Sequence, residues 1–254
     1  MNIKIIDEKE QFAQCETFEI THLLWGTKAI PKTYGKIACW KEHGFLVEMT
    51  CEEADPLRTY LKMNDPVSQD SGMEAFLGFW SEETPLYVNV EMNANGATLI
   101  QYGTERTDRT FFTEEQIRIC QPQAVIEKNC WNICFFLPLE LLEEIGGPIP
   151  QIAGTKIACN FYKVCEGGNA EQIHYASYSP VDVPEPDFPT GCAQQLPSTD
   201  ASTDLPVLSG SPMMSALPEC HPPRYFPGDD PGCIRDSESH RTIPAALCRS
   251  LLLL

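Results

Sequence analysis

The fold expected for this chain is decided by two neighbouring stretches, Met73–Trp80 (MEAFLGFW) and Leu86–Asn93 (LYVNVEMN). Alternate residues in each stretch fall into two sets, and a period of two is typical of a half-buried β-strand. One set is an apolar core face: Met73, Ala75, Leu77 and Phe79 with Leu86, Val88, Val90 and Met92. The other set mixes polar and aromatic side chains: Glu74, Phe76, Gly78 and Trp80 with Tyr87, Asn89, Glu91 and Asn93.

The mixed face is where we expect function. Carboxylates and amides can form hydrogen bonds with hydroxyl groups in pairs, and aromatic rings can stack on the C–H faces of a sugar. The alternative is a solvated sheet face that carries a few rings, and the pattern alone leaves it open.

Other strand-like segments lie on both sides of these two stretches. They are Phe18–Trp25, Gly35–Lys41, Phe45–Glu52, Ala97–Tyr102, Trp131–Leu137, Lys156–Val164 and Gln172–Tyr178. Turns at His43-Gly44 and Asn95-Gly96 predict two hairpins, and Leu139–Ile145 reads as one short helix before Gly146. Short strands with little helix predict an all-β, antiparallel, jelly-roll-like sandwich.

Composition narrows the classes of function. The net charge of −18 over 254 residues argues against nucleic acid and against anionic membranes, which both need basic surface. The first residues carry no apolar signal core, and no run approaches the ~18 apolar residues of a membrane span. We therefore expect a cytoplasmic protein. Reduced, packed thiols are then expected for the 12 cysteines rather than disulfides.

Composition changes sharply near residue 191, so we expect a sandwich domain over 1–191 and a tail over 192–254. All ten lysines and all nine asparagines precede this point, and the tail is rich in proline. It shows no sustained strand or helix period, which is typical of a disordered segment. The abrupt switch favours translation from a shifted reading frame, and we assign the tail no function.

Other chemistry has weaker support. A carboxylate pair drawn from Asp70, Glu74 and Glu91 could serve a glycosidase, but any acidic β-protein offers such pairs. Calcium is left open because Glu53, Asp65 and Asp70 lie near one another in sequence, although solvated loop carboxylates explain them better. We expect a protein that is not an enzyme and has no certain cofactor.

Four blocks, in order, resemble the family-nine-like carbohydrate-binding modules. They are Asn64–Leu77 with its D-S-x-x-E-x-F pattern, Tyr87–Gly96, Asn160–Lys163, and Tyr175–Pro180 followed by Pro186–Phe188. The resemblance spans about Phe18 to Gly191. The family's closing strand begins with Phe-Gly, where this chain has Cys192-Ala193-Gln194, which suggests a lost edge strand.

The resemblance implies a sandwich that binds mono- or oligosaccharides without cleaving them. In the family, two rings enclose a terminal sugar while carboxylate, amide and arginine groups hold its hydroxyls, and calcium is seen. Carried over, the implied sugar-binding residues are Glu74, Asn89, Glu91, Asn160 and Tyr178, with Trp80 as the candidate second ring because Val67 and Ser68 stand where that ring is expected.

Two alternative functions stay open for a sandwich related to this family. One is an intracellular interaction domain with a protein partner that has lost sugar binding. The other is a haem-binding relative, for which Met73, Met92 and His174 offer no convincing axial pair.

Overall fold

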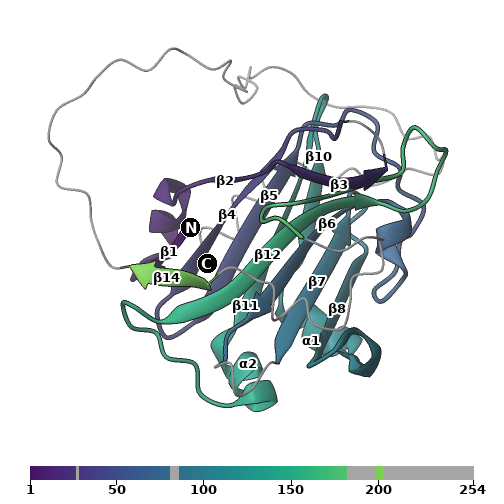
Figure 1. Cartoon of the computed structure of the whole chain (residues 1–254). Coiled ribbons are helices and arrows are strands. Elements are labelled where there is room, and N and C mark those ends of the chain that lie inside the picture. The colour runs from purple at the N-terminus through teal and green to yellow at the C-terminus, as the bar shows by residue number, and fades with distance from the viewer. Residues whose placement is uncertain (27–28, 81–85, 182–197, 203–254) are drawn as a thin grey trace, which may run out of the picture. The chain divides into compact units, whose positions relative to one another are not determined.

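The structure is a computed structural model that describes residues 1–26, 29–80, 86–181 and 198–202. Its strands form a two-layer β-sandwich (Figure 1). One layer contains β2 (Phe18–Ile20), β4 (Thr33–Trp40), β5 (Gly44–Cys51), β10 (Gln123–Ile126) and β11 (Trp131–Pro138). The other contains β3 (His22–Gly26), β6 (Ser71–Gly78), β7 (Tyr87–Asn93), β8 (Thr98–Gly103), β9 (Thr110–Phe111), β12 (Lys156–Cys165) and β13 (His174–Ser177).

Strands β1 (Asn2–Ile6) and β14 (Ser198–Ser202) join the two layers, in the order β4-β1-β14-β12. Pairing within the layers is antiparallel, whereas β1 runs parallel to both β4 and β14. The helical elements are short: η1 (Lys9–Gln14), η2 (Val67–Gln69), η3 (Arg106–Asp108), α1 (Glu114–Ile119) and α2 (Leu139–Gly146). The expected all-β sandwich is confirmed.

The main core lies between the layers and contains the apolar set of the two deciding strands. Met73, Ala75 and Leu77 of β6 and Val88 and Val90 of β7 are fully buried there. Their burial removes apolar surface from water on the inner face of the sheet, which is the main stabilising contribution to such a fold.

The outer face of β6 is also buried, so the expectation of a half-buried strand is wrong for β6. Every residue from Ser71 to Gly78 is buried. A second cluster, Phe76, Tyr87, Tyr162 and Val164, covers this face, and Leu24, Trp25, Tyr175 and Val181 pack on it. The aromatic members of the mixed set therefore shield one another.

Both predicted hairpins are present. β4 pairs with β5 from Thr33↔Cys51 to Trp40↔Gly44, and β7 pairs with β8. Gly96 in the second turn has φ +81°, a conformation that residues with a Cβ adopt only under strain. The predicted helix is α2, which ends at Gly146.

The sequence reasoning missed or merged several elements. The single strand expected over Phe18–Trp25 is two strands, β2 and β3, which pair with different partners, β4 and β13. Helix α1 was not expected, although Thr113 and Gln116 form a capping box at its start. The short strands β1, β9 and β10 were not expected either.

A strand also lies within the expected tail. Ser198–Ser202 forms β14 and pairs with both β1 and β12, so the expectation of a tail without regular structure is wrong for these five residues. Strand pairing uses backbone groups and needs no apolar alternation. The remainder of the expected tail, and Pro186–Phe188 of the family blocks, lie outside the described residues.

Thiols behave as expected in the described part of the chain. Cys15, Cys39, Cys51, Cys120 and Cys165 are buried free thiols. Burial raises the pKa of Cys39 and of Cys120 to about 12, so both stay protonated at neutral pH. In the same residues, no helix has the length and apolar character needed to cross a bilayer.

Candidate functional site

Apart from Trp80, the mixed set lies on the outer face of β6 and β7. This face continues over β12 and β8, which run beside them in Figure 1. Residues directly opposite one another in an antiparallel pair point to the same side of the sheet. One row across the face is Tyr162, Glu74, Glu91 and Leu99. The next row is Asn160, Phe76, Asn89, Gln101 and, on β9, Phe111.

Glu74 and Glu91 form a pair of facing carboxylates. Burial first, and then the neighbouring Glu91, raise the pKa of Glu74 well above its usual range. Burial also raises the pKa of Glu91 to about 7, and the positive charge of Arg109 opposes this rise. Among the described residues, none donates a hydrogen bond to the Glu74 carboxylate.

Arg109 brings the positive charge to this face. Its Nε donates to the Tyr87 hydroxyl at 2.7 Å, and its Nη1 lies 3.5 Å from Oε1 of Gln101. The guanidinium carbon lies 5.3 Å from the ring centroids of both Phe76 and Tyr87, a distance typical of cation–π contact. These contacts hold the guanidinium over the rings and beside the carboxylates.

Asn89 is the most unusual polar group on the face. It is fully buried between Phe76 and Gln101, yet neither its amide nitrogen nor its amide oxygen reaches a hydrogen-bond partner with good geometry. The amide is close enough to Glu91 to favour its charged form. A buried amide without partners costs free energy, so a site of this kind calls for a functional explanation.

Aromatic rings border the carboxylates. The ring centroid of Phe76 lies 5.9 Å from that of Tyr87, with the two rings stacked, and 5.1 Å from that of Tyr162, with the two rings edge-on. Trp25 and Tyr175 are half-buried and meet edge-on at 5.8 Å. Tyr175 lies opposite Val164 of β12, on the same side of the sheet as Glu74. Burial first, then Glu166 and Glu74, raise the pKa of Tyr175.

The structure brings together only part of the predicted site. Glu74, Asn89 and Glu91 are immediate neighbours, and Asn160 lies on the same face opposite Phe76. The Asn160 amide is already used: its nitrogen donates to the Tyr162 hydroxyl at 3.1 Å, and its oxygen accepts from the backbone of Ser179 at 2.9 Å. Both polar atoms of the Asn160 amide are therefore engaged in hydrogen bonds within the protein, at the border of the site.

Tyr178 and Trp80 lie elsewhere in the described structure. Tyr178 packs against Phe18 and Phe161 of the main core, with ring centroids 5.6 and 6.3 Å away. Trp80 lies beyond the end of β6, where its indole nitrogen donates to the Gly147 carbonyl at 3.0 Å. Neither ring joins the cluster around Phe76.

Sequence reasoning missed Arg109, and it gave no site role to Trp25 or Tyr162. Arg109 precedes a two-residue strand that has no period to recognise. Trp25 was merged into one long strand, and Tyr162 was noted only as part of a family block. Their places follow from the pairing of strands that lie far apart in sequence.

The carboxylates considered for calcium have other partners. Asp70 accepts from the backbone of Thr59 and Tyr60 at 2.7 and 2.9 Å, and from the Asn93 amide at 2.7 Å. Asp65 accepts from the backbone of two residues in its own loop. Within the described residues, no three His, Cys, Asp or Glu side chains gather as a metal site would require.

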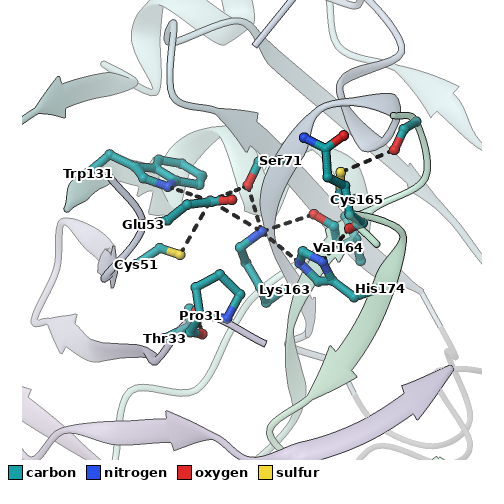
Figure 2. A network of polar contacts seen from close by, with 12 residues as sticks. Pro31, Thr33, Cys51, Glu53, Ser71, Trp131, Lys163, Val164, Cys165 and His174 are labelled. Carbon is teal, nitrogen blue, oxygen red and sulfur yellow. Dashed lines mark hydrogen bonds and ion pairs between the residues drawn. The ribbon is translucent and has the colours of Figure 1, made fainter. Parts of the chain in front are cut away.

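A second polar cluster lies inside the sandwich, at one end of the core (Figure 2). Lys163 is fully buried, and its ammonium lies 2.7 Å from the Ser71 hydroxyl, 3.2 Å from the Val164 carbonyl and 3.0 Å from Nε2 of His174. Its charge is balanced by Glu53 at 3.8 Å, which also accepts from the Trp131 indole at 3.1 Å. Both layers of the sandwich are thus joined through one ammonium.

The charges in this cluster are fixed by their neighbours. Burial alone would raise the pKa of Glu53, but Lys163, Ser71 and Trp131 together hold it below its usual value. Burial and the Lys163 charge lower the pKa of His174 to about 4, so His174 is neutral and its Nε2 accepts from the ammonium. A pocket of about 150 Å³ borders Glu53 and His174.

The methionines considered for haem are core residues. Met73 and Met92 face each other across β6 and β7 with no exposed surface. His174 already uses both ring nitrogens, for Lys163 and for the Gln172 carbonyl. These three residues therefore do not form an axial pair.

Comparison with known proteins gives the family of this β-sandwich. The chain belongs to carbohydrate-binding family 9, whose model matches residues 4–194. Sequence comparison with proteins of curated function gives no match.

Solved structures share the fold. A putative carbohydrate-binding protein from Bacteroides uniformis superposes with a TM-score of 0.67 at 18% identity, over 80% of this chain and 98% of that one. A family 9 module from Caldicellulosiruptor kristjanssonii in complex with cellotriose gives 0.51 at 11% identity, over 84% and 100%. The same kind of module in complex with glucose gives 0.51 at 10%, over 82% and 99%.

Proposed function

We propose that this protein binds carbohydrate, without cleaving it, on the outer face of β6, β7 and β8. The observation that carries the proposal is the facing pair Glu74 and Glu91, in which Glu74 has no hydrogen-bond donor among the described residues. Carboxyl oxygens accept hydrogen bonds from hydroxyls, and two facing carboxyl groups fit the neighbouring hydroxyls of a sugar ring.

The groups around the pair complete a site of mixed chemistry. Arg109 can donate to sugar oxygens, and Asn89 can both donate to and accept from a hydroxyl that reaches it. Trp25 and Tyr175 supply half-buried rings beside the carboxylates, suited to the C–H face of a sugar. Family membership and the sugar complexes of two neighbouring folds support the same class of ligand.

The position of the two carboxylates favours binding over hydrolysis. Glycosidases place their acid and their nucleophile or base on opposite sides of the scissile bond. Glu74 and Glu91 are directly opposite on adjacent strands and point to the same side of one sheet. Both therefore approach a sugar from one side. Asp70, the third candidate for acid–base work, is occupied by three donors.

The proposal is tested by calorimetric titration of the full chain with glucose, xylose, mannose, galactose and their β-linked trisaccharides. Saturable heat with one sugar series is expected. Glu74→Gln keeps the shape but replaces one carboxyl oxygen with an NH2 group that cannot accept a hydrogen bond, and should weaken binding by about tenfold, the effect of one lost hydrogen bond.

Glu19→Gln is the matched control, because Glu19 is an exposed carboxylate on β2 of the other layer. It should leave the affinity unchanged. Absence of heat with every sugar, from a sample that unfolds cooperatively, would overturn the proposal and favour an interaction domain with a protein partner.

A further inference from the structure

The two facing carboxyl groups of the candidate site differ in how far they reach the solvent. Glu74 keeps only 5% of its surface accessible, whereas Glu91 is partly exposed. They lie directly opposite each other on β6 and β7 and point to the same side of the sheet. A ligand that approaches this face therefore meets the Glu91 carboxyl first, with the more deeply buried Glu74 carboxyl next to it.

Negative groups outnumber positive ones in the electrostatic surroundings of this pair. Burial is the largest cause of the raised pKa of both carboxyl groups, and the negative charge of Glu166 adds to the rise. The positive charges of Arg109 and Arg106 oppose it. With all five groups ionised, the three carboxylates carry one charge more than the two guanidinium groups balance. A further positive charge, supplied by a ligand, would stabilise the ionised pair.

Asn89 gives an independent indication that a ligand enters this face. It lies two residues before Glu91 on β7, so both side chains point to the same side. Its amide is fully buried, and neither amide atom reaches a hydrogen-bond partner among the described residues. The face thus offers three acceptor groups: two carboxyls and the Asn89 amide oxygen. A hydroxyl has one hydrogen to donate, whereas an ammonium group has three.

The rings beside the carboxyl groups also suit a positive charge. The Arg109 guanidinium already lies 5.3 Å from the ring centroids of Phe76 and Tyr87, which shows that ring faces here can accept a cation. Trp25 and Tyr175, which face each other on β3 and β13, remain half-buried. Rings of this kind attract a cation and also pack on the C–H groups of a sugar.

We propose that the preferred ligand is an amino sugar, whose protonated amine takes the place of one hydroxyl and lies between the carboxylates of Glu74 and Glu91. This inference rests on the proposed function and adds to it a preference for a positively charged sugar over its neutral counterpart. The ammonium donates charge-assisted hydrogen bonds to the carboxylates, which are roughly twice as strong as hydrogen bonds between neutral groups.

The test is calorimetric titration of the full-length protein at pH 6.5, where sugar amines are mostly protonated. It compares glucose with its monoamino derivatives, which carry the amine at C2, C3 or C6, and with N-acetylglucosamine, in which the amine is a neutral amide. The galactose and mannose series are treated in the same way. One amino sugar should bind at least about tenfold more tightly than the neutral sugar of its series. The N-acetyl derivative should show no such gain.

Proton exchange gives a second measurement. Burial makes both carboxyl groups hold their protons more strongly than usual, so an ammonium that lies between them displaces protons from the protein. Titrations in buffers of different ionisation enthalpy count these protons, and the amino sugar should release more of them than the neutral sugar. Glu91→Gln should reduce both the affinity ratio and the proton release. Glu19→Gln, which changes an exposed carboxylate of the other layer, should change neither.

The outcomes separate this inference from the proposed function. Every amino sugar binding no more tightly than its neutral counterpart would overturn the charge preference and leave carbohydrate binding standing. A Glu91→Gln protein that keeps the wild-type ratio would overturn the assignment of the preference to this carboxylate pair. A folded wild type that binds none of these sugars, neutral or amino, overturns both.

Discussion

Glu74 lies directly opposite Glu91 across β6 and β7, so two carboxylates with raised pKa share one buried face. Like charges opposite each other in a sheet destabilise the pair. The positive charges of Arg109 and Arg106 offset the effect only in part. The fold therefore carries an unfavourable interaction at the place where the ligand is expected to bind.

The first prediction is that Glu74→Gln stabilises the ligand-free protein at pH 8. Because the pKa of Glu74 is raised in the native state, the unfolded chain ionises at lower pH, and native stability falls as the pH rises from about 4.5 upward. The neutral amide does not suffer this loss. We expect the Tm at pH 8 to rise by about 2–4 °C, the shift that about 1 kcal/mol produces in a domain of this size.

Scanning calorimetry at pH 8 and pH 4.5 checks this prediction. The difference between the two proteins should shrink at pH 4.5, where Glu74 is protonated in the native state. A variant that is less stable than the wild type at pH 8 would contradict the idea of a charge-strained pair, because it would show that the carboxylate is favourably solvated or paired.

The second prediction concerns the pH dependence of sugar binding. The pKa of Glu91 is raised to about 7, so Glu91 loses its proton near neutral pH. An ionised carboxylate accepts hydrogen bonds more strongly than a neutral one, so affinity should increase between about pH 6 and pH 8. Calorimetric titrations across this range measure the increase.

Glu91→Gln is the variant that isolates this effect. It should bind more weakly than the wild type at pH 8, and its affinity should change little across the same range. A variant that keeps the wild-type pH profile would assign the titration to another group, and an affinity that falls with rising pH would show that the protonated carboxyl is the binding form.

The third prediction is that Lys163→Met strongly destabilises the sandwich. The change leaves Glu53 without its ammonium partner and removes the donor to Ser71 and His174. Removal of one member of a buried ion pair typically costs about 3–5 kcal/mol. Urea unfolding gives the size of the loss.

The double variant Lys163→Met/Glu53→Gln separates charge from packing, because it removes both charges. It should recover part of the lost stability. Equal destabilisation in the single and double variants would show that the ammonium acts through its hydrogen bonds to Ser71 and Val164 and not through Glu53.

The fourth prediction follows from the neutral His174. Its native pKa of about 4 lies below the unfolded value of 6.5, so the unfolded chain takes up a proton first as the pH falls. Stability should therefore decrease as the pH is lowered from 6.5 to 4. The Glu74–Glu91 pair acts in the opposite direction over part of this range, so the comparison must be made between variants.

His174→Gln provides that comparison, because an amide can still accept a hydrogen bond from Lys163 but does not titrate. Plotted against pH, the stability difference between wild type and variant should shift in favour of the variant as the pH falls from 6.5 to 4. A difference that stays constant with pH would contradict a buried, neutral histidine.

The sequence predicted the strands that show a clear period and missed those that do not. β6, β7 and both hairpins follow from alternation and from the Asn95-Gly96 turn, which are local signals. β9 has only two residues, too few to show a period, although it pairs with the preceding strand β8. β14 has no alternation, and its pairing depends on β1 and β12, which lie far away in sequence. The same holds for the merged β2 and β3, whose partners lie in different layers.

The candidate site was likewise predicted only in part, where its residues follow a local pattern. Glu74, Asn89 and Glu91 were found because they alternate within two adjacent strands. Tyr178 was proposed by analogy with the family, but in the described structure its ring packs on the main core. Arg109 reaches the face through tertiary contacts with Tyr87 and the Phe76 ring, which no local pattern encodes.

The last prediction concerns Asp70, the first residue of the D-S-x-x-E-x-F block. Its buried carboxylate receives the backbone N–H groups of Thr59 and Tyr60 and the Asn93 amide, and so fixes the loop before β6 to the end of β7. Tyr60 in that loop packs against Leu99, the residue opposite Glu91. Asp70→Asn turns an amide donor toward three donors, and should cost about 1–3 kcal/mol.

Asp65→Asn is the control, because the Asp65 carboxylate accepts from the exposed backbone of Leu61 and Lys62. It should cost less than Asp70→Asn in urea unfolding. Hydrogen exchange adds a local readout: the amides of Thr59 and Tyr60 should lose protection in Asp70→Asn and keep it in Asp65→Asn. Unchanged protection in Asp70→Asn would mean that packing of Tyr60 on Leu99, and not the carboxylate, holds the loop at the border of the site.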